Sequence, residues 1–541
     1  MCSCAPILSA SPASPGRTLQ HRSPGLGRRR DHARGLHAVT RSNPGQSLSR
    51  VRASDPRPAS ASPDHCSKCL VSSGLPQSHC FSSVRPRVVI IGDGLAGLAT
   101  AYYLPAGTFD IHLVPFIRED QRVAWHESHE SPSVPSEATS ARQHFLPLLV
   151  LGHHRETWTL LAQLHGHDSF PPYASVQLEF LTPSQPPTAF RPLSVPSPIH
   201  TLLGILRFEA LSLYDRWRLL AHLEGLWEGA EEDTIDLDYH TADRWVASWE
   251  QSSAASSHVW DPLCRFMLGD PLSIASAASF KCALKQFFFA PRHHELIAVF
   301  AGTLRSQLLT PLEQRLRNGG ITWHEQPVSH LTDNGRQMTG AVLRNGQTLT
   351  ADQYVVALPP HALLSLLSEH LLSRFSSFEQ LHDIVVRPIT ILAFRLAHRS
   401  THPRLLLGPP PFLYTLWIPI TEGTREETTI YGTVLQDDVA NCSLEAWVRA
   451  TLTMPCLSSV LGDTDLDWSL KEWEVIHKAW PSYSSRPGFS AIRPLQRSPI
   501  ENLYVAGGWT DTELPPSSLE SELISAKLCA EVVNEPCSPS R

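Results

Sequence analysis

The sequence predicts an α/β fold of two joined domains, one of which is assembled from segments far apart in the chain. A length of 541 residues exceeds what one simple core accommodates. Residues 87–91 are a run of β-favouring residues that leads into a glycine-rich turn, and a helical pattern follows at once. Residues 321–358 are rich in β-favouring residues around an Asn-Gly turn, and residues 502–509 contain a further strand pattern. Because β segments return late in the chain, we expect the first domain to be discontinuous.

The glycine-rich turn carries a dinucleotide-binding fingerprint. Gly92, Gly94 and Gly97 stand between the predicted strand and the predicted helix, which is the context that the fingerprint requires. The first glycine permits a tight turn, the second lets the backbone approach a pyrophosphate, and the third lets the helix pack closely on the strand. The helix N-terminus adds N–H groups and the positive end of a dipole. The segment therefore predicts a Rossmann-type domain; the alternative is a glycine-containing turn that binds no ligand.

The second predicted strand, residues 109–114, lacks the acidic residue that the fingerprint expects at its end. That residue would hold the hydroxyl groups of a ribose. Pro115 stands there and cannot accept such a hydrogen bond, while Glu119 and Asp120 follow in a different register. The pyrophosphate half of the predicted site is therefore complete, and the ribose half is altered.

Residues 1–85 form a leader that differs in composition from the rest of the chain. They are rich in Ser and Pro and contain eleven Arg and one Lys but three Asp and no Glu, although the whole chain has a net charge of −7. This composition is typical of an organelle transit peptide, which would direct the protein to a plastid or mitochondrion. A disordered or wrongly assigned leader explains it equally well, and the protein would then be cytoplasmic or peripheral to a membrane. Nothing around Arg28-Arg29-Arg30 resembles a nucleic-acid-reading domain, so we expect no nucleic-acid partner.

The cysteines and histidines indicate no metal site. The segment His65-Cys66-x-x-Cys69 has only part of the spacing of a zinc site, and it lies in the leader. The cysteines outside the leader show no paired pattern, which fits a reducing compartment. The pairs His153-His154 and His293-His294 lack a third ligand at a useful spacing. No Ser/His/Asp, Cys/His or paired-carboxylate arrangement stands out, so the sequence names no catalytic residue.

Helical patterns separate the predicted strands. Residues 198–228 predict two amphipathic helices, which we expect to pack inside a substrate-binding domain; insertion into a membrane surface is the alternative. Residues 240–315 continue as helix, and a last helix is predicted from about residue 516 to residue 533. No apolar run approaches the roughly 18 residues that a transmembrane helix needs.

Motifs spread along the chain resemble those of one known superfamily. Besides the glycine-rich turn, they are Leu151-Gly152-x-x-Arg155-Glu156-Thr157, Pro196-x-Pro198-Ile199-His200, Leu211-Ser212-Leu213-x-x-Arg216, Val259-Trp260-Asp261-Pro262-Leu263-Cys264, Val355-Val356-Ala357-Leu358-Pro359-Pro360, and residues 502–515. Together they resemble the FAD-dependent amine-oxidase and carotenoid-desaturase superfamily over nearly all of residues 86–535. Within it they are most similar to the squalene-associated branch of hydroxysqualene dehydroxylases, above all in the Trp260–Cys264 motif and in residues 502–515.

The resemblance implies an amine-oxidase-like architecture, in which a discontinuous Rossmann-type FAD-binding domain joins an α+β substrate domain. It assigns residues 86–150, 296–365 and 491–535 to the FAD-binding domain and residues 151–295 and 366–490 to the substrate domain.

The resemblance also implies which residues contact FAD, and where this chain departs from the family. The implied contacts are Gly92, Gly94, Leu95, Ala96 and Gly97 at the pyrophosphate, Val328 at the adenine, Arg122 in place of an arginine that follows two glycines in relatives, and Gly507, Gly508, Trp509 and Thr510 at the flavin. Pro115 replaces the ribose carboxylate, and Gly508 replaces an aspartate at the ribityl or phosphate end of the flavin. Glu520-Ser521-Glu522 replaces a Glu-Gly-Ala sequence and brings an extra negative charge.

The implied activity is an FAD-dependent oxidation or reduction of an apolar isoprenoid, foremost the replacement of the hydroxyl group of hydroxysqualene by hydrogen to give squalene. The alternatives are a phytoene-type carotenoid desaturase, an amine oxidase, and a non-catalytic binding protein with an altered FAD site. A long apolar substrate requires an apolar pocket and favours peripheral contact with a membrane. The segment Phe287-Phe288-Phe289 and the helices that carry Trp158 and Trp217 are candidates for lining that pocket, although core packing is the commoner fate of such residues.

Overall fold

The structure, a computed structural model, describes residues 85–105, 107–116, 146–166, 169–182, 185–191, 199–228, 236–288, 297–396, 402–408, 412–422, 425–435, 473–516 and 518–535. All of these residues belong to one compact unit, Phe81–Arg541. The predictions for the leader, for Arg122 and for the His293-His294 pair lie outside the described residues. Within the described ranges, no helix has the length and the apolar content needed to cross a membrane.

A parallel sheet of five strands confirms the predicted α/β fold with a discontinuous Rossmann-type domain. Its strands come from distant parts of the chain and are ordered β18 (Leu503–Val505), β12 (Gln353–Val356), β1 (Arg87–Ile91), β2 (Asp110–Val114) and β8 (Thr322–Trp323). Every neighbouring pair in this sheet is parallel. The carboxyl ends of β1, β12 and β18 therefore meet at one edge, which is the edge where open α/β sheets bind their ligands.

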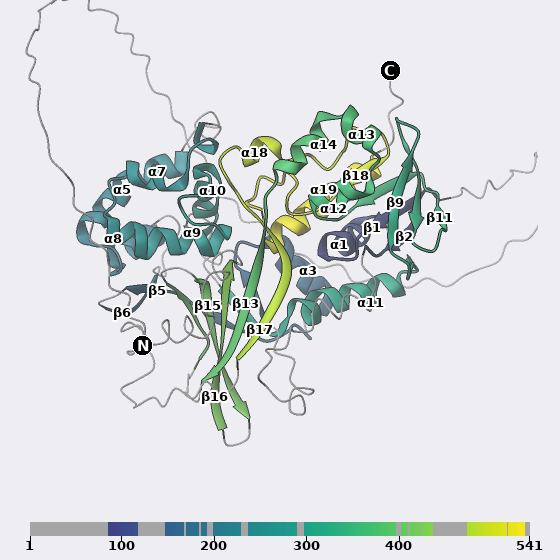
Figure 1. Ribbon diagram of the computed structural model, residues 1–541. Coiled ribbons are helices and arrows are strands. Elements are labelled where there is room, and N and C mark those ends of the chain that lie inside the picture. Colours follow the sequence, from purple (N-terminus) through teal and green to yellow (C-terminus); the bar gives the residue numbers. More distant parts are fainter. Residues whose placement is uncertain are drawn as a thin grey trace, which may run out of the picture. The chain divides into compact units, whose positions relative to one another are not determined.

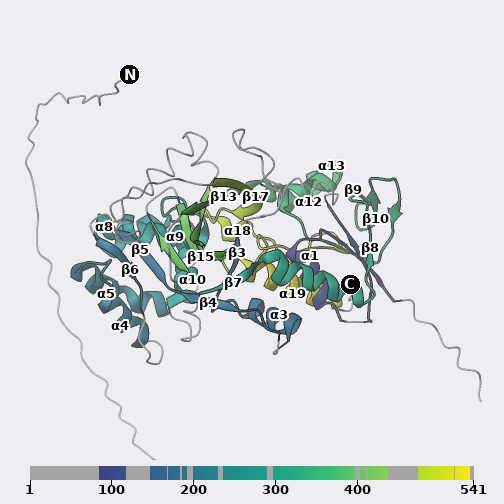
Figure 2. The same cartoon turned by 90° about the horizontal axis from the view of Figure 1, so that it is seen from below.

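The two faces of this sheet pack into separate hydrophobic cores, because successive residues of a strand point to opposite faces. Val88 and Ile90 pack with helices α1 (Leu95–Tyr103), α11 (Thr310–Asn318) and α19 (Leu519–Asn534). Val89 and Ile91 pack with β9 (Val328–Asp333), β10 (Met338–Leu343), β11 (Thr348–Leu349) and α12 (Pro360–Leu366). Helices α1 and α19 lie side by side (Figures 1 and 2). Burial on both faces explains why β1 is apolar from Val88 to Ile91.

A seven-stranded sheet and a group of helices form the second, α+β part. The strands are ordered β17 (Trp473–Tyr483), β13 (Val386–Leu396), β16 (Arg425–Leu435), β15 (Phe412–Glu422), β14 (Arg404–Leu407), β5 (Leu178–Thr182) and β6 (Gln185–Ala189). The helices are α4 (Ile199–Arg207), α5 (Leu213–Glu228), α7 (Ala242–Ser248), α8 (Ser253–Ala255), the π-helix η1 (Ser256–Trp260), α9 (Asp261–Leu268) and α10 (Ala277–Phe288). Helices α5, α7, α8, α9 and α10 gather on one side of the long strands β13 and β17, and α1, α12 and α19 lie on the other (Figure 1).

A three-stranded antiparallel sheet contains a strand that the sequence pattern does not predict. Strand β7 (Ile297–Thr303) pairs with β3 (Pro147–Leu151) and β4 (Tyr173–Val176). The prediction of continuous helix over residues 240–315 is therefore wrong at β7. A short apolar run has no periodicity that distinguishes a buried strand from a buried helix. Residues 297–303 form a strand because they pair with β3 and β4. The π-helix η3 (Arg305–Leu309) follows β7 directly.

Other predicted helices are confirmed with small shifts of their ends. Helices α4 and α5 occupy the region of the two predicted amphipathic helices, and α3 (Arg155–His165) follows β3. Helix α19 begins at Leu519, where Ser518 and Ser521 form a capping box. The described ranges also contain helices α13 (Glu369–Arg374), α14 (Ser376–Gln380) and α18 (Phe489–Ile492) and the 3-10 turn η4 (Leu381–Asp383).

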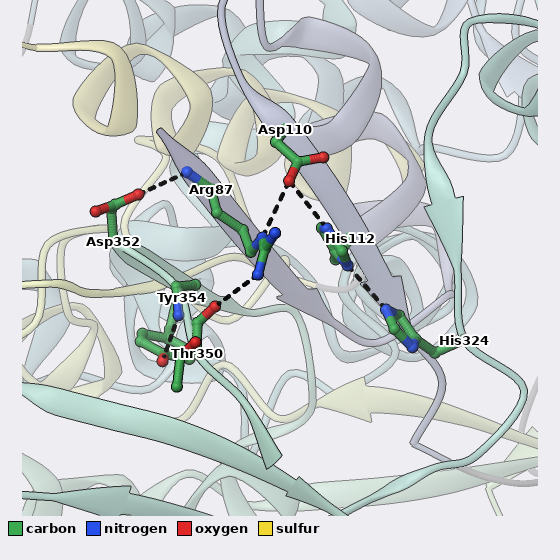
Figure 3. A network of polar contacts seen from close by, with 8 residues as sticks. Arg87, Asp110, His112, His324, Thr350, Asp352 and Tyr354 are labelled. Carbon is green, nitrogen blue, oxygen red and sulfur yellow. Dashed lines mark hydrogen bonds and ion pairs between the residues drawn. The ribbon is translucent and has the colours of Figure 1, made fainter. Parts of the chain in front are cut away.

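A polar network ties the strands together at the amino end of the parallel sheet, away from the ligand-binding edge (Figure 3). Arg87 Nε donates to Asp110 Oδ2 at 3.0 Å, and the Arg87 backbone N–H donates to Asp352 Oδ2 at 2.7 Å. His112 Nε2 lies 3.2 Å from Asp110 Oδ2, and His112 Nδ1 lies 2.9 Å from His324 Nε2. These contacts link the first residues of β1 and β2 to the segments around β8 and β12, so we regard the network as structural.

Candidate functional site

The glycine-rich turn connects β1 to α1 at the carboxyl edge of the parallel sheet. Gly92 has a φ of +111°, and a Cβ atom there would lie 2.4 Å from the carbonyl oxygen of Ala357. A Cβ atom at Gly97 would lie 1.9 Å from the carbonyl oxygen of Gly92. These two positions therefore exclude any side chain. Gly94, in contrast, is exposed, and a Cβ atom there would have nothing within 4 Å.

The N-terminus of α1 presents free amide groups beside this open space. The first intrahelical bond runs from the N–H of Leu98 to the carbonyl oxygen of Gly94 at 3.0 Å. The amides of Leu95, Ala96 and Gly97 precede it, and the N-cap residue Gly94 supplies no side chain to satisfy them. The first turn also contains no acidic residue. Unpaired N–H groups and the positive end of the helix dipole suit an anion such as a pyrophosphate.

The end of β2 is built differently from the expectation for a ribose and adenine site. Pro115 follows β2 without offering a carboxylate. Its carbonyl oxygen accepts a hydrogen bond of 3.2 Å from the backbone N–H of Val328, which is 2% exposed. The Val328 amide is therefore already satisfied inside the protein. The end of β2 therefore offers neither a carboxylate nor a free Val328 amide to a ribose or an adenine.

The C-terminal motif forms a tightly bonded loop after β18. Gly507 has a φ of +150°, and its N–H donates to Ser525 Oγ at 2.9 Å. The indole N–H of Trp509 donates to the carbonyl oxygen of Leu358 at 3.0 Å, which joins the loop to the end of β12. The hydroxyl groups of Thr510 and Ser525 lie 2.7 Å apart. Trp509 and Thr510 are both 0% exposed, so these predicted cofactor contacts shape the loop and are enclosed by protein atoms.

Arg493 and Gln496 hold the same loop from a segment that precedes β18. The Arg493 guanidinium donates to the carbonyl oxygens of Thr510 at 3.0 Å and Leu514 at 2.6 Å. Burial lowers the pKa of Arg493 to about 10, so the group stays charged at neutral pH. Gln496 Nε2 donates to Thr510 Oγ1 at 3.1 Å. The sequence analysis missed both residues, because no local pattern distinguishes an arginine or glutamine whose partners lie in another segment.

The two acidic residues at the start of α19 have separate surroundings. Glu520 is 4% exposed, and its carboxylate accepts hydrogen bonds from the N–H groups of Glu156 at 2.8 Å and Thr157 at 3.0 Å. It therefore caps the N-terminus of α3. Glu522 lies against Gly508, whose backbone N–H donates to its carboxyl group. Burial raises the pKa of Glu522 to about 7.

No metal centre accompanies these elements. Across the described ranges, no three His, Cys, Asp or Glu side chains gather where they could hold a metal ion. His153 and His154 lie in the turn before α3, with their ring centroids 4.8 Å apart and their planes nearly perpendicular. Burial keeps the pKa of His154 well below its usual value, so its ring is neutral at neutral pH.

A second feature of the fold is an apolar pocket within the α+β part. It lies between β5, the helices α4 and α5, and the helices η1 to α10, and every residue that lines it is apolar. The lining residues are Leu178, Phe180, Phe190, Ile205, Phe208, Leu211, Leu219, Leu223, Val259, Trp260, Leu263, Leu284 and Phe287. Three of them belong to the Val259–Cys264 motif, which spans the end of the π-helix η1 and the start of α9. Such π-helical turns occur frequently at functional sites.

The aromatic residues proposed for the pocket are only partly placed there. Phe287 lines it. Trp158 instead packs with Phe170, Tyr173 and Phe300 and donates to the carbonyl oxygen of Leu151 at 3.0 Å. Helix α5, which carries Trp217, lines the pocket with Leu219 and Leu223, whereas Trp217 itself is 72% exposed on another face of the helix.

The fold and the site define a dinucleotide-binding α/β protein with a separate apolar pocket. The chain belongs to the flavin-containing amine oxidoreductase family, whose family model matches residues 143–534. A 15-cis-phytoene desaturase of an Oncidium hybrid cultivar is 25% identical over 476 residues, which cover 83% of this chain and 79% of the relative. A zeta-carotene desaturase of Synechocystis sp. is 22% identical over 339 residues, which cover 57% of this chain and 68% of the relative.

Solved structures share the fold. Cyclohexylamine oxidase from Brevibacterium oxydans matches with a TM-score of 0.54 at 16% identity, over 83% of this chain and 98% of that chain. The family identifies the cofactor as a flavin, and the glycine-rich turn fits the pyrophosphate of FAD. The amides of Leu95, Ala96 and Gly97 would hold the pyrophosphate, with Gly94 allowing its close approach. The chain is therefore a flavin-dependent oxidoreductase of the carotenoid desaturase and amine oxidase family.

Proposed function

We propose that this oxidoreductase acts on a long apolar isoprenoid, and specifically that it removes the hydroxyl group of hydroxysqualene to give squalene. The observation that carries the proposal is the apolar pocket, because the Val259–Cys264 motif that resembles the squalene-associated branch supplies part of its wall. A pocket without polar lining residues selects a hydrocarbon chain. An amine substrate would require a polar or charged partner for its nitrogen.

The residues of the chain would bind and orient such a substrate. Burial of apolar surface contributes about 25 cal/mol for each Å², so the part of a polyene that entered this pocket would gain affinity from Phe180, Phe208, Trp260 and their neighbours. FAD, when bound, supplies the redox chemistry, and the fold supplies position and a dry environment.

Desaturation of a carotenoid precursor is the second candidate, because phytoene and zeta-carotene desaturases are among the curated relatives. The two reactions differ in their electron balance. Dehydroxylation takes up two electrons and two protons and releases water, so it requires an external reductant. Desaturation removes two electrons and two protons from the substrate, so it requires an electron acceptor.

We also propose that α4 and α5 contact a lipid bilayer through exposed apolar side chains. Ile199, Leu206, Leu213, Tyr214 and Trp217 are between 46% and 79% exposed on this helix pair. Ile205 and Leu219, on other faces of the same helices, line the apolar pocket, so the helix pair lies between the exposed patch and the pocket. Contact with a bilayer at this patch would bring the pocket close to a lipid-soluble substrate.

Product analysis tests the proposed reaction. The full chain, loaded with FAD, is incubated with hydroxysqualene and a chemical reductant without oxygen, and separately with phytoene and a quinone acceptor. Squalene in the first reaction supports dehydroxylation, and a desaturated carotenoid in the second supports the alternative. If an FAD-loaded protein turns over neither hydrocarbon, the proposal of an isoprenoid substrate is wrong.

A further inference from the structure

Gly508 and Glu522 occupy the same small space at the carboxyl edge of the parallel sheet. A Cβ atom at Gly508 would lie 2.8 Å from Ser521 Oγ and 3.2 Å from Glu522 Oε1. An aspartate at position 508 would therefore require the Ser521 hydroxyl group to move, and it would crowd the Glu522 carboxyl group. The chain lacks a carboxylate on the loop after β18 and carries one on α19 that reaches the same place.

The surroundings of Glu522 leave its carboxylate only partly satisfied. The N–H of Gly508 donates to it, and the N-terminus of α19 favours a negative charge, because Glu522 lies in the first turn of that helix. No cation of the described residues pairs with it. Burial raises the pKa of the Tyr483 phenol, and the negative charge of Glu522 raises it further. Unlike Glu520, it keeps part of its surface accessible.

A carboxylate in this position needs further hydrogen-bond donors. Burial without partners is costly for a charged group, and the accessible surface of Glu522 lies at the edge where open α/β sheets bind their ligands. The flavin half of FAD carries a ribityl chain whose hydroxyl groups are donors. The pyrophosphate of FAD is not a suitable partner for this carboxylate, because both groups are negatively charged and would repel each other.

We propose that Glu522 supplies, from α19, the carboxylate that position 508 lacks, and that it accepts hydrogen bonds from the ribityl hydroxyl groups of FAD. The inference rests on FAD binding by this fold, which the proposed function shares, and it is independent of which hydrocarbon reacts. Glycine at position 508 then leaves room for the side chains of Ser521 and Glu522.

FAD titrations of the full chain, freed of flavin, test this inference. The dissociation constant is measured from flavin fluorescence for the wild-type protein, for Glu522→Ala, for Gly508→Asp, and for the double variant that carries both changes. Glu531→Gln is the matched control, because Glu531 lies on the same helix and is exposed. Thermal unfolding of each flavin-free variant checks that it is folded.

We expect Glu522→Ala to weaken FAD binding about 10-fold to 100-fold, which corresponds to loss of one or two hydrogen bonds to a charged group. Gly508→Asp alone should also weaken binding, because it crowds two carboxylates together. The double variant should recover affinity to within about 3-fold of wild type, and Glu531→Gln should change nothing.

Three results would count against the inference, and they differ in what else they affect. A wild-type protein that binds FAD, together with a folded Glu522→Ala variant of equal affinity, would remove the role of Glu522 and leave the proposed function intact. A folded wild-type protein that binds no FAD would remove the proposed function as well. A double variant that binds FAD as weakly as Glu522→Ala would show that a carboxylate at position 508 cannot take the role proposed for the carboxylate at position 522.

Discussion

The guanidinium group of Arg493 donates to the carbonyl oxygen of Thr510 at 3.0 Å, and this bond fixes the loop that follows β18. The same group also donates to the carbonyl oxygens of Gly508 at 3.2 Å and Leu514 at 2.6 Å. One buried side chain therefore satisfies several backbone acceptors of the loop that carries Gly507–Thr510.

Replacement of Arg493 by alanine should destabilise the protein by about 3 kcal/mol or more, because it leaves buried carbonyl groups without donors. FAD binding should weaken with it. Arg497→Ala is the matched control, since Arg497 is exposed and pairs with Glu535 at 3.0 Å on the surface; it should cost about 1 kcal/mol or less. Urea denaturation measures the free energy of unfolding of both variants and of the wild-type protein. Equal stability of the two variants would show that the loop does not depend on Arg493.

Alanine at Gly94 and alanine at Gly97, the second and third glycines of the fingerprint, should have different effects on stability. At Gly97 the new methyl group would meet the Gly92 carbonyl oxygen at 1.9 Å, so Gly97→Ala should lower the unfolding midpoint strongly. At Gly94 the methyl group meets nothing within 4 Å, so Gly94→Ala should unfold like wild type.

Gly94→Ala should nevertheless bind FAD at least several-fold more weakly, because its methyl group occupies the space through which a pyrophosphate approaches α1. Thermal unfolding of the flavin-free protein and FAD titration separate the two effects. Unchanged FAD affinity in Gly94→Ala would place the pyrophosphate elsewhere.

The stability of the flavin-free protein should depend on pH through Glu522. Burial raises the pKa of Glu522 from 4.5 to about 7 in the folded state, so the folded protein binds more protons than the unfolded chain between these values. The contribution of this group is therefore fully present below pH 4.5 and is lost as the pH rises through 7. The loss is on the order of 3 kcal/mol.

Glu522→Gln should remove this dependence of stability on pH. Urea denaturation of the wild-type protein and the variant at several values between roughly pH 5 and pH 8 measures the difference in their free energies of unfolding. The groups near Glu522 do not titrate in this window, since they are the Gly508 amide and the Tyr483 phenol, whose pKa is raised well above its usual value. A difference between the two proteins that does not vary with pH would contradict the assignment.

Polar replacements on α4 and α5 should reduce binding to lipid vesicles. Leu213→Ser and Trp217→Ser remove side chains that are 79% and 72% exposed, so they should leave the fold intact and weaken co-sedimentation with vesicles several-fold each. Tyr239→Ser is the control, because Tyr239 is 62% exposed outside the helix pair. Equal loss in all three variants would argue against a specific membrane face.

The sequence predicts the parts of the fold that local patterns determine. The strands at residues 87–91 and 353–356 are apolar after their first residue because both faces of the sheet are buried, and the glycines at 92 and 97 are required by backbone contacts within the turn. Strand β7 could not be separated from a helix, because its identity depends on pairing with β3 and β4.

The roles of Arg493, Gln496 and Glu522 could not be predicted for a related reason. Each of these side chains reaches into the loop after β18 from another segment, and only the folded chain brings them together. From the sequence, Gly508 and Glu522 are two separate departures from the family. In the structure they are neighbours, so one departure accommodates the other.

The spectrum of the bound flavin tests the central claim most directly. The full chain is loaded with FAD, reduced chemically without oxygen, and mixed with hydroxysqualene while the visible absorption is followed. The account predicts that the flavin returns to its oxidised spectrum as squalene forms. A bound flavin that stays reduced in the presence of hydroxysqualene would contradict the proposed reaction, and a protein that takes up no flavin would contradict the cofactor site itself.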